Sequence, residues 1–253
     1  MKYFIRRLLN KFTSGQWLKF RSFLSYIVRD DINYYLDGDI GRELYLTGRF
    51  ERRELELCKD FIKEDSIVID VGANIGIHSI YFSKLASKGL VLSIEPQTTI
   101  FPLLIKNTLK YNNIIPLNIA IDYELKISSF YIMEDNAYSS LKDTKRKNIV
   151  DIRKVITIPL DNFMVLFDKI DFIKIDVEGL EKNVILSMLK ILEYFKPVLF
   201  IEIYKGNNSN MDPEGTIKIL LEMGYQAYVV DNQGELDEFT GHKDDRYNYF
   251  FIY

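Results

Sequence analysis

The chain has 253 residues, of which 47% are hydrophobic and 27% charged, an ordinary balance for a globular protein with one large α/β domain and an N-terminal extension. A net charge of −3 does not favour overall binding to nucleic acid. The single cysteine, Cys58, excludes an internal disulfide and a cysteine metal cluster, and two histidines, His78 and His242, exclude a multi-histidine metal site.

Residues 1–29 carry seven basic residues and no acid, interleaved with large apolar side chains. This pattern predicts a basic amphipathic helix, or two, within a helical extension over residues 1–60. Such a helix either docks on an anionic membrane face or packs against the domain or a partner subunit. No apolar run reaches the length of a membrane span, and the N-terminus lacks a signal-peptide core. We therefore expect a cytoplasmic protein, with peripheral contact at the inner membrane face as the alternative location.

The domain, residues 61–253, begins with a strand, a glycine turn and a helix. Residues 67–71 form a short β-branched run that contains Asp70, and residues 77–85 carry an apolar stripe. Between them, Gly72 and Gly76 depart from the G-x-G-x-x-G spacing of dinucleotide sites. The acid, Asn74 and a helix N-terminus suit a zwitterionic tail better than a pyrophosphate. S-adenosylmethionine carries such an ammonium and carboxylate.

The next two predicted strands bring further ligand candidates. Residues 90–94 form a strand that ends in Glu95, at the position where an acid grips a ribose diol in nucleotide-binding sheets. Residues 114–121 form a third strand, and Asn118 near its end either borders an adenine ring or belongs to plain sheet packing.

A long polar segment follows between two further predicted strands, at residues 126–133 and 155–158. Residues 134–153 are rich in lysine and arginine and are expected to form a surface loop. The loop is either a lid with a basic face toward a phosphorylated ligand or a solvated charge run. Asp161 then precedes a short apolar helix and is its expected N-cap.

A second strand–turn–helix unit begins with residues 170–175 and ends its strand at Asp176. A helix is predicted from about Glu181, and the next strand, residues 196–204, contains Glu202. A helix capped by Asp212 and two final strands complete the chain. Strands that alternate with helices predict a doubly wound α/β sheet, in which ligands bind beyond the carboxyl ends of the strands.

The segments Asp-Val-Gly-Ala-Asn-Ile-Gly at 70–76, Ile-Glu-Pro at 94–96 and Lys-Ile-Asp-Val-Glu-Gly-Leu-Glu at 174–181 occur in this order. Together they resemble the FkbM-type methyltransferases, and the resemblance extends over about residues 48–203. It implies a class I Rossmann-like fold, S-adenosylmethionine as methyl donor, and O-methylation, often of sugars or of secondary-metabolite hydroxyls. The basic N-terminus and the charged loop lie outside the motifs.

The predicted site has two parts. The residues expected to bind the cofactor are Asp70, Gly72, Asn74, Gly76, Glu95, Asn118 and Asp176. The residues expected to act on the acceptor are Asp176, Glu178, Glu202 and Lys174. The acids would serve as general base, or would hold a divalent cation that lowers the pKa of the acceptor hydroxyl. For Glu178, the preference of helix N-termini for acids is an equally good explanation.

The expected partner is a small molecule or glycan with a free hydroxyl, and the sequence leaves room for a homo-oligomer. Two alternatives stay open. One is a membrane-docked protein that binds the cofactor without turnover, and the other is a methyltransferase that acts on nucleic acid. The latter is disfavoured because the Asn/Asp-Pro-Pro-aromatic motif of amine methylation is missing.

Overall fold

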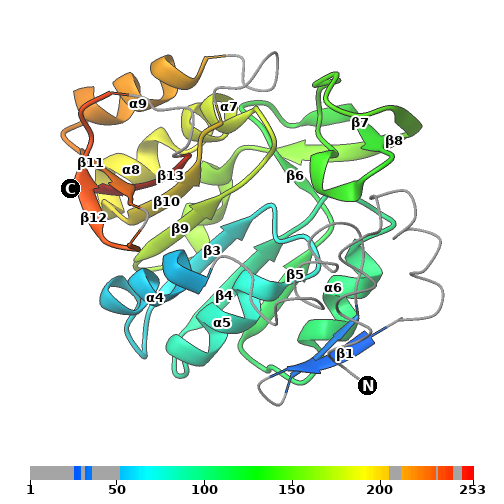
Figure 1. The fold of residues 1–253 in the computed structure, drawn as a ribbon, viewed down its shortest axis with the longest axis horizontal. Coiled ribbons are helices and arrows are strands. Elements are labelled where there is room, and N and C mark those ends of the chain that lie inside the picture. The colour runs from blue at the N-terminus through cyan, green and yellow to red at the C-terminus, as the bar shows by residue number, and fades with distance from the viewer. Residues whose placement is uncertain (1–25, 30–31, 36–51, 205–211, 232, 242–246) are drawn as a thin grey trace.

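The computed structural model describes residues 26–29, 32–35, 52–204, 212–231, 233–241 and 247–253. Its centre is an eight-stranded sheet in the order β12-β11-β13-β10-β9-β3-β4-β5, seen at the centre and left of Figure 1. The strands are β3 (Ile67–Val71), β4 (Leu90–Ile94), β5 (Ile114–Leu117), β9 (Phe172–Ile175), β10 (Val198–Glu202), β11 (Gln226–Val230), β12 (Leu236–Glu238) and β13 (Asn248–Ile252).

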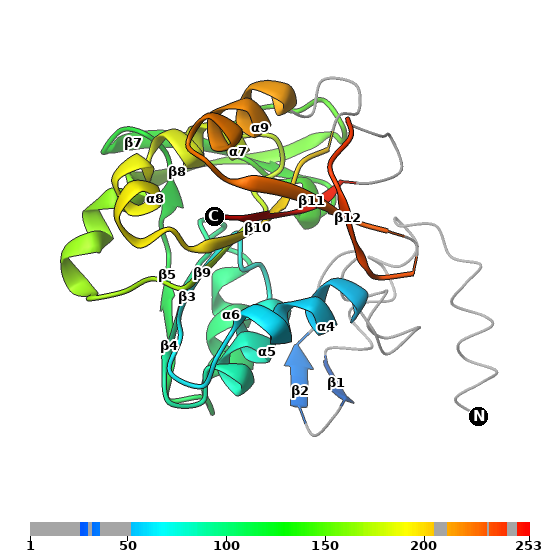
Figure 2. The ribbon, with the colours of Figure 1, turned by 90° about the vertical axis from the view of Figure 1, so that its left-hand side faces the viewer.

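Helices cover both faces of this sheet, as the side view in Figure 2 shows. One layer holds α4 (Arg52–Phe61), α5 (Ile77–Leu85) and α6 (Phe101–Thr108), and the other holds α7 (Glu181–Leu186), α8 (Leu189–Phe195) and α9 (Pro213–Glu222). Each layer has its own apolar core, because strand side chains alternate between the two faces. Val68 packs toward the first layer and Ile69 toward the second.

The predicted doubly wound sheet is confirmed. The chain runs outward from β3 through β4 to β5, and then returns to lay β9 on the other side of β3. All neighbours from β5 to β10 are parallel, whereas β13 enters antiparallel between β10 and β11. The strand order therefore reverses between β3 and β9, which is where ligands bind in sheets of this kind.

A three-stranded sheet, β6-β8-β7, stands beside the main one. It comprises β6 (Ala120–Ile121), β7 (Lys126–Met133) and β8 (Ile149–Ile158). The single strand predicted over residues 114–121 is thus divided, since Ala120 and Ile121 pair with β8 and not with the main sheet. The predicted loop is also shorter than expected, because β8 begins at Ile149.

The predicted N-terminal helix is wrong for its last four residues. Tyr26–Arg29 forms strand β1, which pairs antiparallel with β2 (Ile32–Tyr35). Residues 1–25 lie outside the described part of the chain. Helix α4, which we assigned to the extension, packs into the core through Leu55 and Cys58. Among the described helices none is long and apolar enough to cross a membrane.

Both aspartates that were predicted as helix caps cap a helix, but one of them caps a different helix from the predicted one. Asp212 caps α9 as predicted, since its carboxylate accepts the N–H of Gly215 at 2.9 Å. Asp161 instead lies within a short 3₁₀ segment, Leu160–Leu166, and accepts the N–H of Ile191 at 3.0 Å, which caps α8. The helix predicted from Glu181 divides into α7 and α8 around Ser187.

Candidate active site

Two rows of side chains cross the sheet where the strand order reverses. Asp70 pairs in register with Ser93 on β4 and with Lys174 on β9, which makes an inner row of three polar residues. Because strand side chains alternate, positions two residues further on share the same face. The outer row is therefore Glu95, Gly72 and Asp176, at the carboxyl ends of the strands.

Gly72 leaves the centre of the outer row without a side chain. Its φ of +81° is a conformation that favours glycine, and a Cβ here would lie 1.8 Å from the carbonyl oxygen of Asp176. No other residue fits this position without moving the β9 end. The β3 turn therefore packs directly against the backbone at the end of β9, and no side chain stands between the two carboxylates of the row.

Glu95 is held by backbone groups on both of its oxygens. Oε2 accepts the N–H of Asn74 at 2.9 Å, and Oε1 accepts the N–H of Gln97 at 2.7 Å. Burial raises the pKa of Glu95 to about 7, although these two hydrogen bonds oppose the shift. The carboxylate is therefore fixed in direction and close to its titration point at neutral pH.

The N–H groups of the glycine turn all donate hydrogen bonds within the protein, whereas the helix N-terminus was expected to meet the charged tail of the ligand. Gly72 and Ala73 donate to the carbonyl of Ile94, and the next three N–H groups donate to Glu95, to the Asn74 side chain and to the Ala73 carbonyl. What the turn offers a ligand is its shape and the Glu95 carboxylate that it orients.

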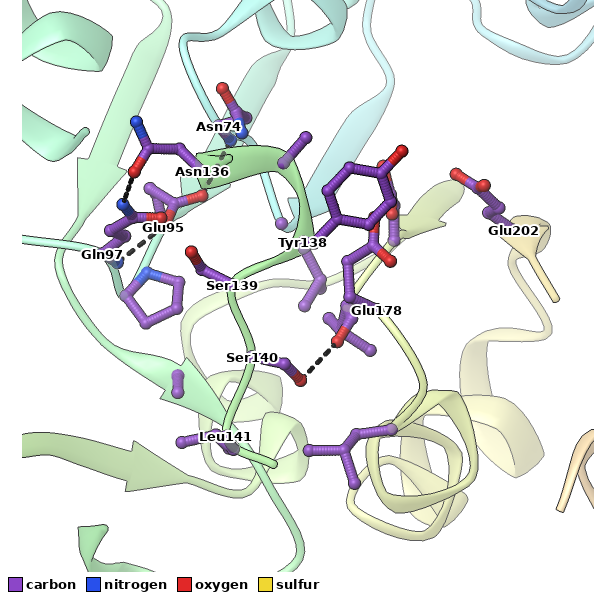
Figure 3. A pocket seen from close by; sticks show the side chains of 18 of the residues that line it. Asn74, Glu95, Gln97, Asn136, Tyr138, Ser139, Ser140, Leu141, Glu178 and Glu202 are labelled. Atoms are coloured by element: carbon purple, nitrogen blue, oxygen red, sulfur yellow. Dashed lines mark hydrogen bonds between the residues drawn. The ribbon is translucent and has the colours of Figure 1, made fainter. Parts of the chain in front are cut away.

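A cavity of about 550 Å³ opens over the outer row. Figure 3 shows Asn74, Glu95 and Gln97 on one side of it and Tyr138, Glu178 and Glu202 on the other. The cavity wall also includes apolar side chains, those of Ile94, Pro96, Ala120, Ile121 and Phe130. Asp176, Glu178 and Glu202 together make one half of the cavity acidic.

The predicted residues divide between cavity wall and support. The wall includes Gly72, Asn74, Glu95, Asp176, Glu178 and Glu202. The described lining does not include Asp70, Gly76, Asn118 or Lys174. Gly76 faces helix α6, where an added Cβ would lie 2.7 Å from Leu104 Cδ1. Asn118 holds the chain after β4, since its amide donates to the carbonyl of Glu95 at 2.9 Å.

Lys174 lies between Asp70 of the inner row and Asp176 of the outer row and pairs with both. Its ammonium lies 3.2 Å from Asp176 Oδ2 and 3.7 Å from Asp70 Oδ1. Asp70 is fully buried and also accepts the hydroxyl of Ser79 at 2.5 Å. Lys174 was expected to act on the acceptor, but it lies outside the described lining and contacts Asp176 from behind the cavity wall.

Three glutamates, Glu178, Glu181 and Glu202, lie close together where β9 and β10 end. Glu178, with φ of +56°, pairs with Arg146, and burial together with nearby Asp176 raises its pKa despite that arginine. Burial also raises the pKa of Glu181 to about 7, although its carboxylate accepts the N–H of Gly179. Within the described ranges, no three His, Cys, Asp or Glu side chains are grouped to hold a metal ion.

The loop between β7 and β8 contributes Asn136, Tyr138 and Arg146 to the cavity wall, although none of the three was among the predicted site residues. Asn136 accepts a hydrogen bond from Gln97 beside Glu95, and Ser140 donates to the carbonyl of Val177 at 3.1 Å. The loop therefore spans the cavity, as Figure 3 shows. It also brings Arg146 into the cavity wall, so at least this member of the charge run is not simply solvated. The signal available in the sequence was the basic run of the loop, Lys142 and residues 145–147.

A profile of the methyltransferase FkbM domain matches residues 70–227, which is more than half of the chain. The chain belongs to the FkbM methyltransferase family. It is an S-adenosylmethionine-dependent methyltransferase, and the resemblance read from the motifs at 70–76 and 174–181 is confirmed.

One relative and one solved structure are similar to this FkbM methyltransferase over most of its length. The hexuronic acid methyltransferase AglP of Haloferax volcanii is 29% identical over 200 residues, which cover 78% of this chain and 79% of that protein. A crystal structure of methyltransferase FkbM from Methylobacillus flagellatus KT superposes with a TM-score of 0.53 at 16% identity. The match covers 83% of this chain and 52% of that one, and it supports the shared Rossmann-like fold.

Proposed function

We propose that this FkbM methyltransferase transfers a methyl group from S-adenosylmethionine to a hydroxyl of a sugar or glycan. The observation that carries the proposal is the outer row, in which Glu95 and Asp176 line one cavity on either side of Gly72, with no side chain between them. One carboxylate then serves the donor and the other serves the acceptor. The similarity to a hexuronic acid methyltransferase supports a sugar as the acceptor.

The donor half is the half of the cavity at Glu95. Glu95 has the oriented carboxylate that a ribose diol needs, and Ile121 and Phe130 of the cavity wall offer apolar contact to a base. Gly72 and Asn74 line the path toward Asp176. When bound, S-adenosylmethionine supplies an electrophilic methyl group on a sulfonium. Asp70, Gly76 and Asn118 support this half from behind and shape the turn.

The acceptor half is the acidic half. A hydroxyl must lose its proton as its oxygen bonds to the methyl carbon, so a carboxylate near the acceptor accelerates the reaction as a general base. Asp176 is suited to this role, because its side chain is 25% exposed to the cavity and Lys174 fixes one of its oxygens. Glu202 lines the same half and would orient the acceptor.

Calorimetric titration with S-adenosylhomocysteine, the product form of the donor, tests the donor half. Glu95→Gln keeps the shape of the side chain but removes its charge, and binding should weaken by about 1.5–3 kcal/mol, the usual loss for a charge-assisted hydrogen bond. Glu64→Gln is the matched control, since Glu64 is exposed and pairs only with Lys88 among the described residues. Equal affinities for wild type and Glu95→Gln would remove Glu95 from the site.

A further inference from the structure

Within the described lining, Arg146 is the one lysine or arginine of the cavity wall. Its guanidinium carbon lies 4.3 Å from the ring centre of Tyr138 and 4.9 Å from that of Tyr204. Tyr138 belongs to the loop over the cavity and Tyr204 follows β10, so the guanidinium is held from two separate elements. All three residues line the cavity. Stacking on two rings fixes the plane of the guanidinium before any ligand binds.

Glu178 occupies one edge of this guanidinium, through an ion pair with Nη1 of Arg146. Within the described residues, it is the only carboxylate that pairs with Arg146. Two features make Glu178 a partner that can be replaced. Its backbone has a left-handed φ of +56°, which costs free energy in a non-glycine residue. The charge of nearby Asp176 also disfavours the ionised form of the Glu178 carboxyl group.

An arginine carries five N–H donors in a planar fork, and the fork matches a carboxylate through two parallel hydrogen bonds. Arg146 stands in the acidic half of the cavity, beside Asp176 and Glu202, where the acceptor is placed under the proposed function. A neutral acceptor needs no cation at this position. An acceptor with its own carboxylate would otherwise be repelled by three acids.

We propose that the acceptor is an acidic sugar, whose carboxylate replaces that of Glu178 on the Arg146 guanidinium. The proposal rests on the proposed function and adds the charge of the substrate. It commits to a carboxylate rather than a phosphate, because the group that already occupies the fork is a carboxylate of the same geometry. Arg146 is then a specificity residue, and Glu178 pairs with its guanidinium as long as no acceptor is bound.

Saturation-transfer NMR on the full chain, loaded with S-adenosylhomocysteine, tests this with matched sugars. The probes are the methyl glycosides of glucuronate and galacturonate against those of glucose and galactose, with methyl glucoside 6-phosphate as the phosphate arm. The uronates should bind at least about tenfold more tightly than the neutral sugars, the usual scale for a charge-assisted pair. Arg146→Met should abolish this preference, and Glu178→Gln should raise uronate affinity because a neutral amide holds the guanidinium less strongly than a carboxyl group that can ionise.

Calorimetry with S-adenosylhomocysteine distinguishes a failure of the proposed function from a failure of the acidic-sugar proposal. If wild type does not bind it, the proposed function fails. If it binds with equal affinity to wild type and Arg146→Met, the variant is folded and its sugar data stand. Equal binding of uronates and neutral sugars, binding of neither, or a clear preference for the phosphate would then overturn the acidic-sugar proposal alone. A Glu178→Gln variant with unchanged or weaker uronate binding would also contradict it.

Discussion

The ammonium of Lys174 lies 3.2 Å from a carboxylate oxygen of Asp176, and only 4% of the lysine side chain is exposed. Behind it, Asp70 is fully buried at 3.7 Å. One buried cation thus balances a structural carboxylate and a carboxylate of the cavity wall. Motion of Lys174 would change the position of Asp176, which ties the stability of the sheet to the acceptor half of the site.

Lys174→Met should therefore destabilise the protein by about 3–5 kcal/mol, since removing one partner leaves Asp70 buried without its counter-charge. Urea unfolding measures this loss. The matched control is Lys169→Met, because Lys169 pairs with Asp65 at the surface, where an ion pair is worth roughly 1 kcal/mol or less. Adding Asp70→Asn to Lys174→Met should restore part of the stability. Similar losses for the two lysine variants would show that Lys174 does not neutralise Asp70.

The raised pKa of Glu95 predicts that cofactor binding depends on pH. At pH 6 the group, with a pKa of about 7, is mostly protonated, whereas a ribose diol that donates hydrogen bonds favours the ionised form. Binding must then release a proton, and affinity should fall by up to about tenfold per pH unit below 7. Titrations with S-adenosylhomocysteine in buffers of different ionisation enthalpy count that proton. Glu95→Gln should release none, and an equal count in both proteins would contradict the assignment.

Gly72→Ala should destabilise the protein because the new Cβ would lie 1.8 Å from the Asp176 carbonyl oxygen. Gly241→Ala isolates the backbone contribution, since Gly241 also has a positive φ, of +133°, but no atom lies within 4 Å of its added Cβ. We expect Gly72→Ala to cost at least about 2 kcal/mol more than Gly241→Ala in urea unfolding, the scale of an overpacked core. Equal costs would mean that the strand ends separate easily.

The sequence predicted the sheet well because buried parallel strands are apolar runs that end abruptly. The bounds of β3, α5, β4 and β7 agree with the prediction residue by residue. Very short strands were harder to predict from the sequence. β6 consists of Ala120 and Ile121 alone, and its choice of the second sheet depends on pairing with β8, which no local pattern reveals.

The site was predicted in part, for a reason that lies in strand geometry. Residues at the ends of neighbouring strands were expected to share one crevice, and Glu95, Asp176 and Glu202 do line it. Asp70 stands one pleat further in, level with Ser93, because side chains on one face repeat every two residues. The loop that holds Arg146 was expected to be either a lid with a basic face or a solvated charge run. No local pattern decides between the two, since the place of Arg146 depends on how the loop crosses the cavity from the second sheet.

The most direct test of the account is the rate of methyl transfer by Asp176→Asn, measured next to its affinity for S-adenosylhomocysteine. The substitution keeps the shape of the side chain and removes the charge that would accept the hydroxyl proton. We expect turnover to fall about a hundredfold or more, the range for loss of a general base, while affinity for S-adenosylhomocysteine changes little. Normal turnover by Asp176→Asn would contradict the division of the cavity into a donor half at Glu95 and an acceptor half at Asp176.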